Sequence, residues 1–220
     1  MRILAISDIH GSSNALKKLK KSSSKVDLII IAGDITVFGN HIEEIMKKIN
    51  SWNKKTLLIT GNHEIPAQIS KLVKKFKNIH FMNNKIMKIK NLLIYGYDTN
   101  GFSFKDSIFE KESKKFVKAI KEEHKKLKNK QKAIKTKANK IKKTTNTIKT
   151  ILISHAPPYG TKADKIMDEH CGSKSVRDFC KKNNITYCFC GHLHEASHTV
   201  DKLKKTIVVN PGPYGMTFEI

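Results

Sequence analysis

The sequence predicts an α/β fold with mixed β-sheets. Short runs of β-branched and other apolar residues, each the length of a buried strand, alternate with segments whose apolar residues follow helical spacing. The runs begin at Ile3, Leu28, Leu57, Ile151 and Ile185. Each run leads directly, or after one glycine, into Asp, Asn or His. This pattern is typical of open α/β sheets that bind a ligand at the carboxyl ends of their strands.

Three helices are expected in the first half of the chain, where they would cover a sheet. Ser12–Leu16 has the form of a helix cap and first turn, because serine and asparagine precede apolar residues. His41–Ile49 carries isoleucine and methionine at helical spacing. Pro66–Phe76 is expected to be a third helix, since proline is favoured in a first helical turn.

The remaining elements are expected to build a second sheet. Asparagine-containing turns separate three short strands after residue 78, and a helix is expected at Ser173–Asn183. Asn210-Pro211-Gly212 is expected to be a turn. The other expected strands are Ile79–Phe81, Ile86–Ile89, Leu92–Tyr95, Ile151–Ser154, Ile185–Cys190, Thr199–Val200 and Ile207–Val209.

Five of these strands deliver side chains that can bind metal. His192 and His194 lie two residues apart on an extended segment, which places both imidazoles on one side, as a chelating pair requires. Imidazole, carboxylate and amide donors without a thiolate suit Mn, Fe, Zn, Ni or Co better than Ca. The donors are too many for one tetrahedral ion, so we expect two divalent ions about 3.5–4 Å apart that share a carboxylate. The candidate ligands are Asp8, His10, Asp34, Asn62, His155, His192 and His194.

Taken singly, these residues have other interpretations. Asp8 and Asp34 could be turn formers or helix caps, and Asn62 could be a turn amide that tolerates a left-handed backbone. Glu64 and Glu195 directly follow candidate site histidines. They could orient those histidines from just outside the metal shell, or be solvated loop carboxylates.

The blocks D-x-H, G-D, G-N-H-[DE], H and G-H-x-H occur in this order between Met1 and about Asn210. In this the chain resembles the calcineurin-like metallophosphoesterases. The resemblance implies a sandwich of two mixed β-sheets flanked by helices, the four-layer αββα fold. It also implies two metal sites that share Asp34 as the bridging ligand. One site would consist of Asp8, His10, Asp34 and His194, and the other of Asp34, Asn62, His155 and His192.

The same resemblance implies roles for residues that contact the substrate. His63 matches the family's histidine that binds no metal and contacts the scissile phosphate or protonates the leaving group. Asp34 and His63 are therefore the expected catalytic residues, and Asn62 and His63 are expected to touch the substrate. The loop from His155 to Thr161 is similar to one that borders the pocket in small family members, including relatives of cyclic-nucleotide phosphodiesterases. Tyr159 in this loop would bind substrate or pack on the sheet.

The expected activity is hydrolysis of a small phosphoester. A solvent oxygen that bridges two divalent cations loses its proton near neutral pH, so a metal-bridging hydroxide would attack the phosphorus while His63 assists the leaving group. Phosphodiesters are expected before phosphomonoesters, because the sequence shows no cap domain over the site. Two alternatives share the fold: a nuclease that binds nucleic acid, and a non-catalytic scaffold protein, against which the intact donors argue.

Length and composition favour one domain spanning residues 1–220, because 220 residues with 39% hydrophobic content can bury one substantial core. The chain enters a strand at once and has no signal-peptide pattern. It also has no apolar run long enough to cross a bilayer. We therefore expect a cytoplasmic protein without membrane contact. The sequence does not indicate an oligomeric state.

Half of the net charge of +24 lies in a lysine-rich insertion at about residues 105–149, which holds 17 basic and 5 acidic residues. Isoleucine or leucine recurs there every seven residues, as in an amphipathic helix with a narrow apolar seam. We expect this helix to lie on its own domain. Its lysines favour weak, nonspecific, salt-sensitive binding of nucleic acid, but aromatic residues for base stacking are scarce. The seam residues are Ile120, Leu127, Ile134, Ile141 and Ile148.

Overall fold

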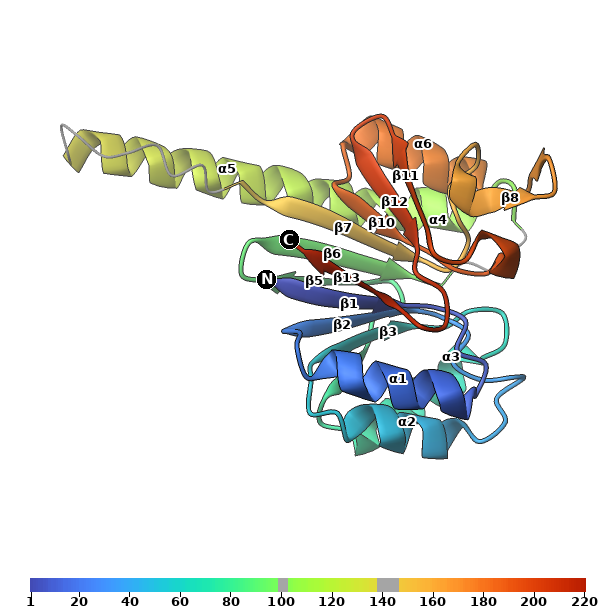
Figure 1. Cartoon of the computed structure of the whole chain (residues 1–220). Helices are drawn as coiled ribbons and strands as arrows, with labels where there is room; N and C mark the ends of the chain where they lie inside the picture. The colour runs from blue at the N-terminus through green and yellow to red at the C-terminus, as the bar shows by residue number, and fades with distance from the viewer. Residues whose placement is uncertain (99–102, 138–146) are drawn as a thin grey trace.

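Two large β-sheets lie face to face with helices on both outer sides (Figure 1). The computed structural model describes residues 1–98, 103–137 and 147–220, with the side chains of helix α5 described as far as residue 129. The four layers confirm the fold class that the sequence and its family resemblance predict.

The first sheet brings three candidate loops to one edge. Its strand order is β13-β1-β2-β3-β4; β1 to β4 are parallel and β13 is antiparallel to β1. The carboxyl ends of β1, β2 and β3 therefore meet at the same edge. The strands are β1 (Arg2–Ile6), β2 (Leu28–Ala32), β3 (Thr56–Ile59), β4 (Ile79–Phe81) and β13 (Met216–Glu219).

The second sheet supplies the other two candidate loops. Its strand order is β11-β12-β10-β7-β6-β5, with a parallel centre and an antiparallel strand at each end. The strands are β5 (Lys85–Ile89), β6 (Leu92–Tyr97), β7 (Lys149–Ser154), β10 (Tyr187–Phe189), β11 (Thr199–Leu203) and β12 (Thr206–Asn210). A separate hairpin joins β8 (Lys165–Ile166) to β9 (Glu169–His170).

Helices cover the outer face of each sheet. The side chains of Ser12 and Ser173 accept hydrogen bonds from backbone N–H groups three residues further on, which caps α1 and α6. The first sheet carries α1 (Ser13–Ser23), α2 (Ile42–Asn50), α3 (Pro66–Leu72) and the 3₁₀ turn η1 (Val73–Lys75). The second carries α4 (Ser107–Glu112), α5 (Lys114–Lys137) and α6 (Lys174–Asn183). Two further 3₁₀ turns are η2 (Lys162–Asp164) and η3 (His194–Ala196).

Alternate residues of the central strands enter different cores. In β2, Leu28, Ile30 and Ala32 belong to the core between the sheets, whereas Ile29 and Ile31 belong to the core under the helices. Both faces of the strand are buried, which explains why its sequence is apolar throughout instead of alternating. The same arrangement holds the strand ends, and hence the loops after them, in fixed positions.

The chain changes sheets at two places that the sequence left unassigned. Of the three expected strands after residue 78, β4 joins the first sheet, while β5 and β6 join the second. After the expected turn at Asn210-Pro211-Gly212, the chain returns to the first sheet as β13, which pairs with β1. The exposure of β13 alternates between half-buried and exposed residues, so it lacks the apolar run that marks the central strands.

The lysine-rich segment contains all of α4 and α5, and its last residue, Lys149, begins β7. Phe116 and Ile120 are buried against the second sheet and Leu127 is half-buried, so the first half of α5 lies on its own domain. Beyond this the helix projects past both sheets (Figure 1). The seam residues Ile134 and Ile141 fall outside the described side chains. The prediction that Ile148 belongs to the helical seam is wrong, because Ile148 directly precedes β7 and packs there against the core of the second sheet. Within the described residues, no helix is both long and apolar enough to span a bilayer.

Candidate metal centre

All seven candidate ligands meet at the carboxyl ends of five strands. Because β1, β2 and β3 of one sheet and β7 and β10 of the other end at the same side, their loops face one another. Each loop contributes one or two side chains: Asp8 and His10 after β1, Asp34 after β2, Asn62 after β3, His155 after β7, and His192 and His194 after β10.

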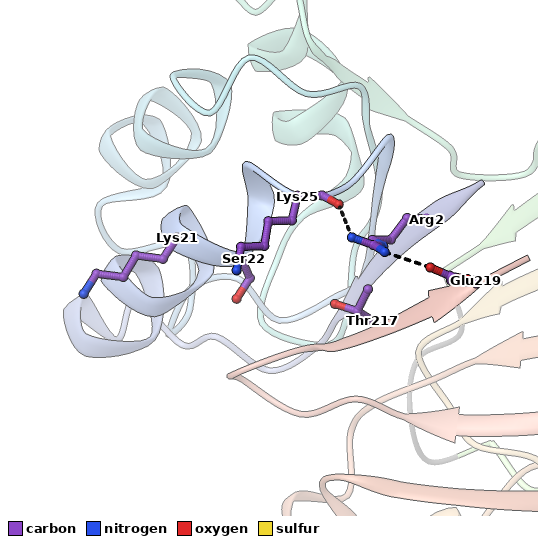
Figure 2. Close-up of a pocket in the computed structure, with 6 residues that line it drawn as sticks. All are labelled: Arg2, Lys21, Ser22, Lys25, Thr217 and Glu219. Carbon is purple, nitrogen blue, oxygen red and sulfur yellow. Dashed lines mark hydrogen bonds and ion pairs between the residues drawn. The ribbon is translucent and has the colours of Figure 1, made fainter.

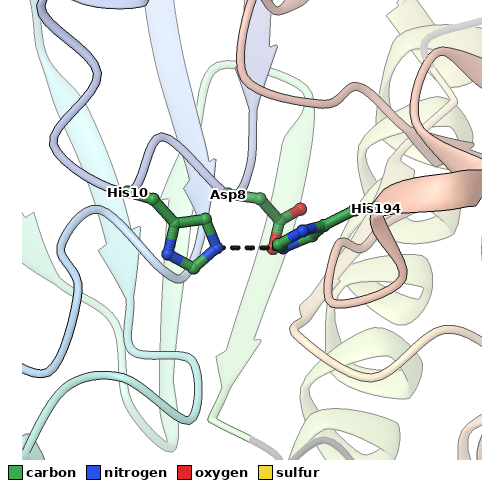
Figure 3. Close-up of side chains that lie close together, drawn as sticks. All are labelled: Asp8, His10 and His194. Atoms are coloured by element: carbon green, nitrogen blue, oxygen red, sulfur yellow. Dashed lines mark hydrogen bonds and ion pairs between the residues drawn. The ribbon is translucent and has the colours of Figure 1, made fainter.

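The first group consists of Asp8, His10 and His194 (Figure 3). The Nε2 atoms of His10 and His194 lie 2.9 Å apart, and His194 Nε2 lies 3.9 Å from Asp8 Oδ1. The Nδ1 atom of His10 lies 3.0 Å from the carbonyl oxygen of Thr36 and must donate to it. In the neutral ring Nε2 then carries a lone pair, which is the form that binds metal.

Asp34 stands between the two groups. Its Oδ2 atom lies 3.2 Å from His155 Nε2, 3.8 Å from His10 Nε2 and 3.9 Å from His63 Nε2. Its Oδ1 atom accepts a hydrogen bond of 3.0 Å from the backbone N–H of His63. One carboxylate oxygen thus faces imidazoles from three different loops, as a bridging ligand would.

The second group is completed by an amide oxygen. Asn62 Oδ1 lies 3.1 Å from His155 Nε2 and 2.9 Å from His192 Nδ1. His155 Nδ1 donates to the carbonyl oxygen of Ala32 at 2.8 Å, so in the neutral ring Nε2 also presents a lone pair. Asp34, Asn62, His155 and His192 therefore form a continuous set of oxygen and nitrogen donors.

The buried carboxylates of this region would be stabilised by a bound cation. Asp8 is 4% exposed and Asp34 is 2% exposed, and Asp8 Oδ2 has no hydrogen-bond partner among the described residues. Burial opposes ionisation of Asp34, but His155 and the His63 N–H stabilise its carboxylate and hold its pKa below the usual value. Burial and the neighbouring His155 lower the pKa of His192 to about 4, so this ring stays neutral. Burial opposes the charged form of His155, but Asp34 outweighs this effect and raises the pKa of the ring, so positive charge is favoured between these two residues. A divalent transition metal held by imidazole and carboxylate donors would supply that charge in place of the proton.

His63 differs from the candidate ligands in its tautomer. The backbone N–H of Phe38 donates to His63 Nδ1 at 3.3 Å, so Nδ1 carries the lone pair and the neutral ring carries its proton on Nε2. A protonated nitrogen cannot coordinate a metal, but it can donate a hydrogen bond or a proton. His63 Nε2 therefore faces the centre as a donor, while His10 and His155 face it as acceptors.

Glu64 ties two of the loops together, which resolves a choice that the sequence left open. Its carboxylate is buried and accepts four hydrogen bonds of 2.8–3.1 Å, from the N–H groups of Asp34, Thr36 and Gly61 and from the Thr36 hydroxyl. Glu195, by contrast, is exposed. Glu64 thus fixes the backbone on both sides of the bridge position, and Glu195 remains a surface carboxylate.

The glycines of the motifs make the close approach of these loops possible. A Cβ atom on Gly61 would overlap Asp34 Oδ1 and lie 2.7 Å from His155 Cε1. A Cβ atom on Gly191 would lie 2.6 Å from Asp8 Oδ2. Any side chain at either position would push a candidate ligand out of place.

Tyr159 packs within a group of aromatic and basic side chains. Its ring centroid lies 5.3 Å from that of Phe104 and 5.5 Å from that of His170, and Lys174 Nζ lies 5.1 Å from it. The described ring contacts of Tyr159 include none of the seven candidate ligands. Its role in substrate binding stays a prediction.

A cavity of about 310 Å³ opens beside the first group, and sequence reasoning missed most of its lining. Its lining combines three candidate ligands with four residues that were not predicted to belong to the site: Asp8, His10, His194, Ser197, His198, Pro213 and Tyr214. The expected turn after β12 gave no sign that Tyr214 would face the site. Tyr214 could have been assigned to the site only if the pairing of the segment after this turn with β1 had been known.

A larger cavity of about 520 Å³ lies at the opposite end of β1 and offers no such chemistry (Figure 2). Its lining includes Arg2, Lys21 and Lys25. The Arg2 guanidinium already donates to Glu219 at 2.8 Å and to the carbonyl oxygen of Lys25 at 3.4 Å. The candidate centre is therefore the better place for a reaction.

Comparison with known proteins identifies the family. The family model described as calcineurin-like phosphoesterase matches residues 1–196, so the chain belongs to this family of metal-dependent phosphoesterases. The uncharacterized protein MJ1162 of Methanocaldococcus jannaschii is 34% identical over 97% of this chain and 88% of its own.

Solved structures share the fold at low sequence identity. A dimetal phosphatase from Danio rerio has a TM-score of 0.56 and 11% identity, over 99% of this chain and 91% of that one. A structure described as a novel archaeal phosphodiesterase has a TM-score of 0.52 and 14% identity, over 96% and 84%. At these identities the likeness establishes the fold alone.

Proposed function

We propose that this protein is a phosphodiesterase that uses two divalent transition-metal ions, drawn from Mn, Fe, Zn and Ni. The observation that carries the proposal is the position of Asp34 Oδ2, which lies within 4 Å of the Nε2 atoms of His10, His63 and His155. Asp8, His10, Asp34 and His194 would hold one ion. Asp34, Asn62, His155 and His192 would hold the other.

The chain's own residues then divide the work of hydrolysis. Two divalent ions bound here would lower the pKa of water and draw negative charge from the phosphoryl oxygens. A water oxygen forms the new bond to phosphorus and loses its proton to solvent, while the ester P–O bond breaks. His63 donates a hydrogen bond from Nε2 to the charge that develops on the departing oxygen, and that oxygen takes its proton from solvent. Phe38 and Asp34 hold His63 in place through Nδ1 and the backbone N–H.

The cavity beside the first group supports a diester over a monoester. Its volume of about 310 Å³ is at the lower end of the range for small-ligand pockets, so it has room for a second organic arm on the phosphate. Among the residues that line it, all in the described part of the chain, none is Lys or Arg. A monoester dianion would benefit from such cations, whereas a diester carries a single charge.

A hydrolysis screen tests the class of substrate and the metal together. After chelation, the protein is supplied with Mn, Fe, Zn, Ni or Mg in turn and assayed with matched alkyl monoesters and diesters. We expect hydrolysis with at least one transition metal and a higher kcat/KM for diesters. Faster hydrolysis of the monoesters would reject the diester assignment. A protein purified without chelator that contains no metal and gains no activity would point to a scaffold.

His63→Ala tests the division of labour within the site. We expect metal content to stay at the wild-type level, because His63 is outside both donor sets. The kcat on an alkyl diester should fall about 10²–10³-fold, as when one hydrogen-bond donor to a developing charge is removed. His41→Asn is the matched control, since His41 is an exposed histidine at the start of α2. Full activity of metal-loaded His63→Ala would contradict the proposed role.

A further inference from the structure

Exposed apolar side chains gather on the two loops that carry His63 and Asp34. Phe38 is 76% exposed, its neighbour Val37 is 41% exposed, and Ile65, two residues after His63, is 65% exposed. The Phe38 and His63 ring centroids lie 4.4 Å apart with the rings tilted by 38°. A single exposed apolar residue needs no explanation, but a group of them beside a candidate proton donor does.

The loop that carries Phe38 is held firmly in an unusual conformation. Phe38 has a φ of 49°, in the left-handed region that bulky residues rarely adopt. Gly39 N–H donates to the Thr36 hydroxyl at 3.0 Å, and Thr36 is bound in turn to Glu64. Strained backbone that its surroundings hold in place is characteristic of ligand-binding positions. The exposed ring is thus fixed beside His63.

We infer that Phe38 is the surface on which the leaving alcohol of the substrate rests, and that the protein favours diesters whose leaving alcohol carries an aromatic ring. This inference rests on the proposed function. The leaving oxygen must come within hydrogen-bond distance of His63 Nε2 to accept its hydrogen bond. The group attached to that oxygen then lies beside the imidazole, within reach of the Phe38 ring, whose centroid is 4.4 Å from that of His63.

A row of rings separates this surface from the cavity that would take the other arm. Ring centroids are 4.4 Å apart from Phe38 to His63, 4.7 Å from His63 to His10, and 4.8 Å from His10 to His194. The cavity of about 310 Å³ is lined by His10 and His194 from this row and also by Tyr214. The phosphate would sit along this row, with its leaving arm toward Phe38 and its retained arm toward Tyr214.

Two diesters that differ only in the leaving alcohol provide the test. Both carry the same retained arm; one releases benzyl alcohol and the other ethanol, which are alcohols of similar acidity, so ring contact is the main difference. We expect wild-type kcat/KM to favour the benzyl diester roughly three- to tenfold, as an added aromatic pair would. Phe38→Asn keeps the backbone N–H and tolerates a positive φ but removes the ring, so the ratio should fall toward one.

Two further variants show whether the ratio reports the ring itself. Phe38→Tyr keeps the ring and should keep the preference. Ile108→Asn is the matched control, because Ile108 is 66% exposed on α4, and it should also keep the preference. A loss of folded protein would lower both rates equally, so the ratio distinguishes contact with substrate from a structural role.

Four outcomes would overturn the inference. The first is equal kcat/KM on both diesters in the wild type, and the second is an unchanged benzyl preference in Phe38→Asn. The third is self-association in ultracentrifugation that Phe38→Asn abolishes, which would assign the patch to a second copy of the chain. If the wild type hydrolyses neither diester with any metal, the proposed function fails. The binding of benzyl methylphosphonate and of ethyl methylphosphonate is then compared by calorimetry, which tests Phe38 without hydrolysis. Equal affinities for these two compounds are the fourth outcome.

Discussion

Glu64→Gln tests whether the candidate metal centre depends on one buried carboxylate outside it. Glutamine has the shape of glutamate but offers one acceptor oxygen and an NH₂ group. The new side-chain amide can point either its NH₂ group or its oxygen toward Thr36. The first orientation keeps more hydrogen bonds, because the Thr36 hydroxyl can rotate to accept from the NH₂ group and the oxygen still accepts from the N–H groups of Asp34 and Gly61. The backbone N–H of Thr36 then loses its partner in a buried position.

The expected cost follows from these four hydrogen bonds. An orphaned buried N–H costs about 1–3 kcal/mol. The three remaining hydrogen bonds lose their charge assistance, which removes roughly 2 kcal/mol in total. The free energy of unfolding should therefore fall by about 3–5 kcal/mol, which for a chain of this size corresponds to a midpoint lower by about 6–20 °C. Because the loops around Asp34 loosen, metal affinity should fall roughly 10- to 100-fold.

Thermal unfolding of the chelated protein measures the first effect, and calorimetric titration with Mn or Zn measures the second. Glu195→Gln is the matched control, because Glu195 is an exposed carboxylate directly after a candidate ligand. We expect it to change stability by less than about 0.5 kcal/mol. If Glu64→Gln matched Glu195→Gln in both measurements, the four hydrogen bonds would not set the geometry of the centre.

Three more predictions follow from single features. Gly61→Ala places a Cβ atom against Asp34 Oδ1, so the variant should fold but bind metal at least tenfold more weakly, as calorimetry would measure; wild-type affinity would contradict the reading of the loop. Burial raises the pKa of Asp98, at the end of β6, to about 6, above the ordinary value of 3.8, although the Thr60 hydroxyl donates to it. Because the folded state holds this proton more tightly, the free energy of unfolding should decrease as pH rises from about 3.8 to about 6. Asp98→Asn should remove this decrease when the free energy of unfolding is measured in urea at several pH values. An unchanged pH dependence in the variant would exclude Asp98 as its source. Glutamine in place of the exposed lysines of α5 should reduce both the retention on duplex DNA and its dependence on salt, and equal elution of variant and wild type would show that α5 takes no part.

The parts of the fold that could be predicted from sequence are those where both faces of a strand are buried. The central strands carry unbroken apolar runs because each run lies between two cores, and that pattern is visible without knowledge of the neighbouring strands. The runs are residues 3–6 in β1, 28–32 in β2, 57–59 in β3 and 151–153 in β7. β13 has one half-buried face at a sheet edge, so its four residues carry too weak a pattern to assign. The change of sheet between β4 and β5 depends on long-range pairing, which local periodicity does not encode.

The site divides in the same way. The candidate ligands stand at the ends of predictable strands, so their convergence could be inferred from strand order. Glu64 could be identified as a candidate but not assigned, because its burial depends on a loop from another strand. Phe38 and Tyr214 carry no motif at all. Their position beside the centre is a result of tertiary packing, and only the arrangement of the loops reveals it.

Backbone strain connects the fold to the chemistry of the centre. Asp8, His10, Asp34 and His192 all have positive φ, at 54°, 45°, 52° and 74°. A left-handed residue costs on the order of 1 kcal/mol, and Asp, Asn and His bear that cost better than other side chains. The chain must leave a straight, fully buried strand and turn at once, because only an immediate turn keeps the ligand within a few ångströms of the opposite sheet. A β-branched residue could continue the strand but not make this turn, so the same positions that require metal donors also require residue types that tolerate the left-handed conformation.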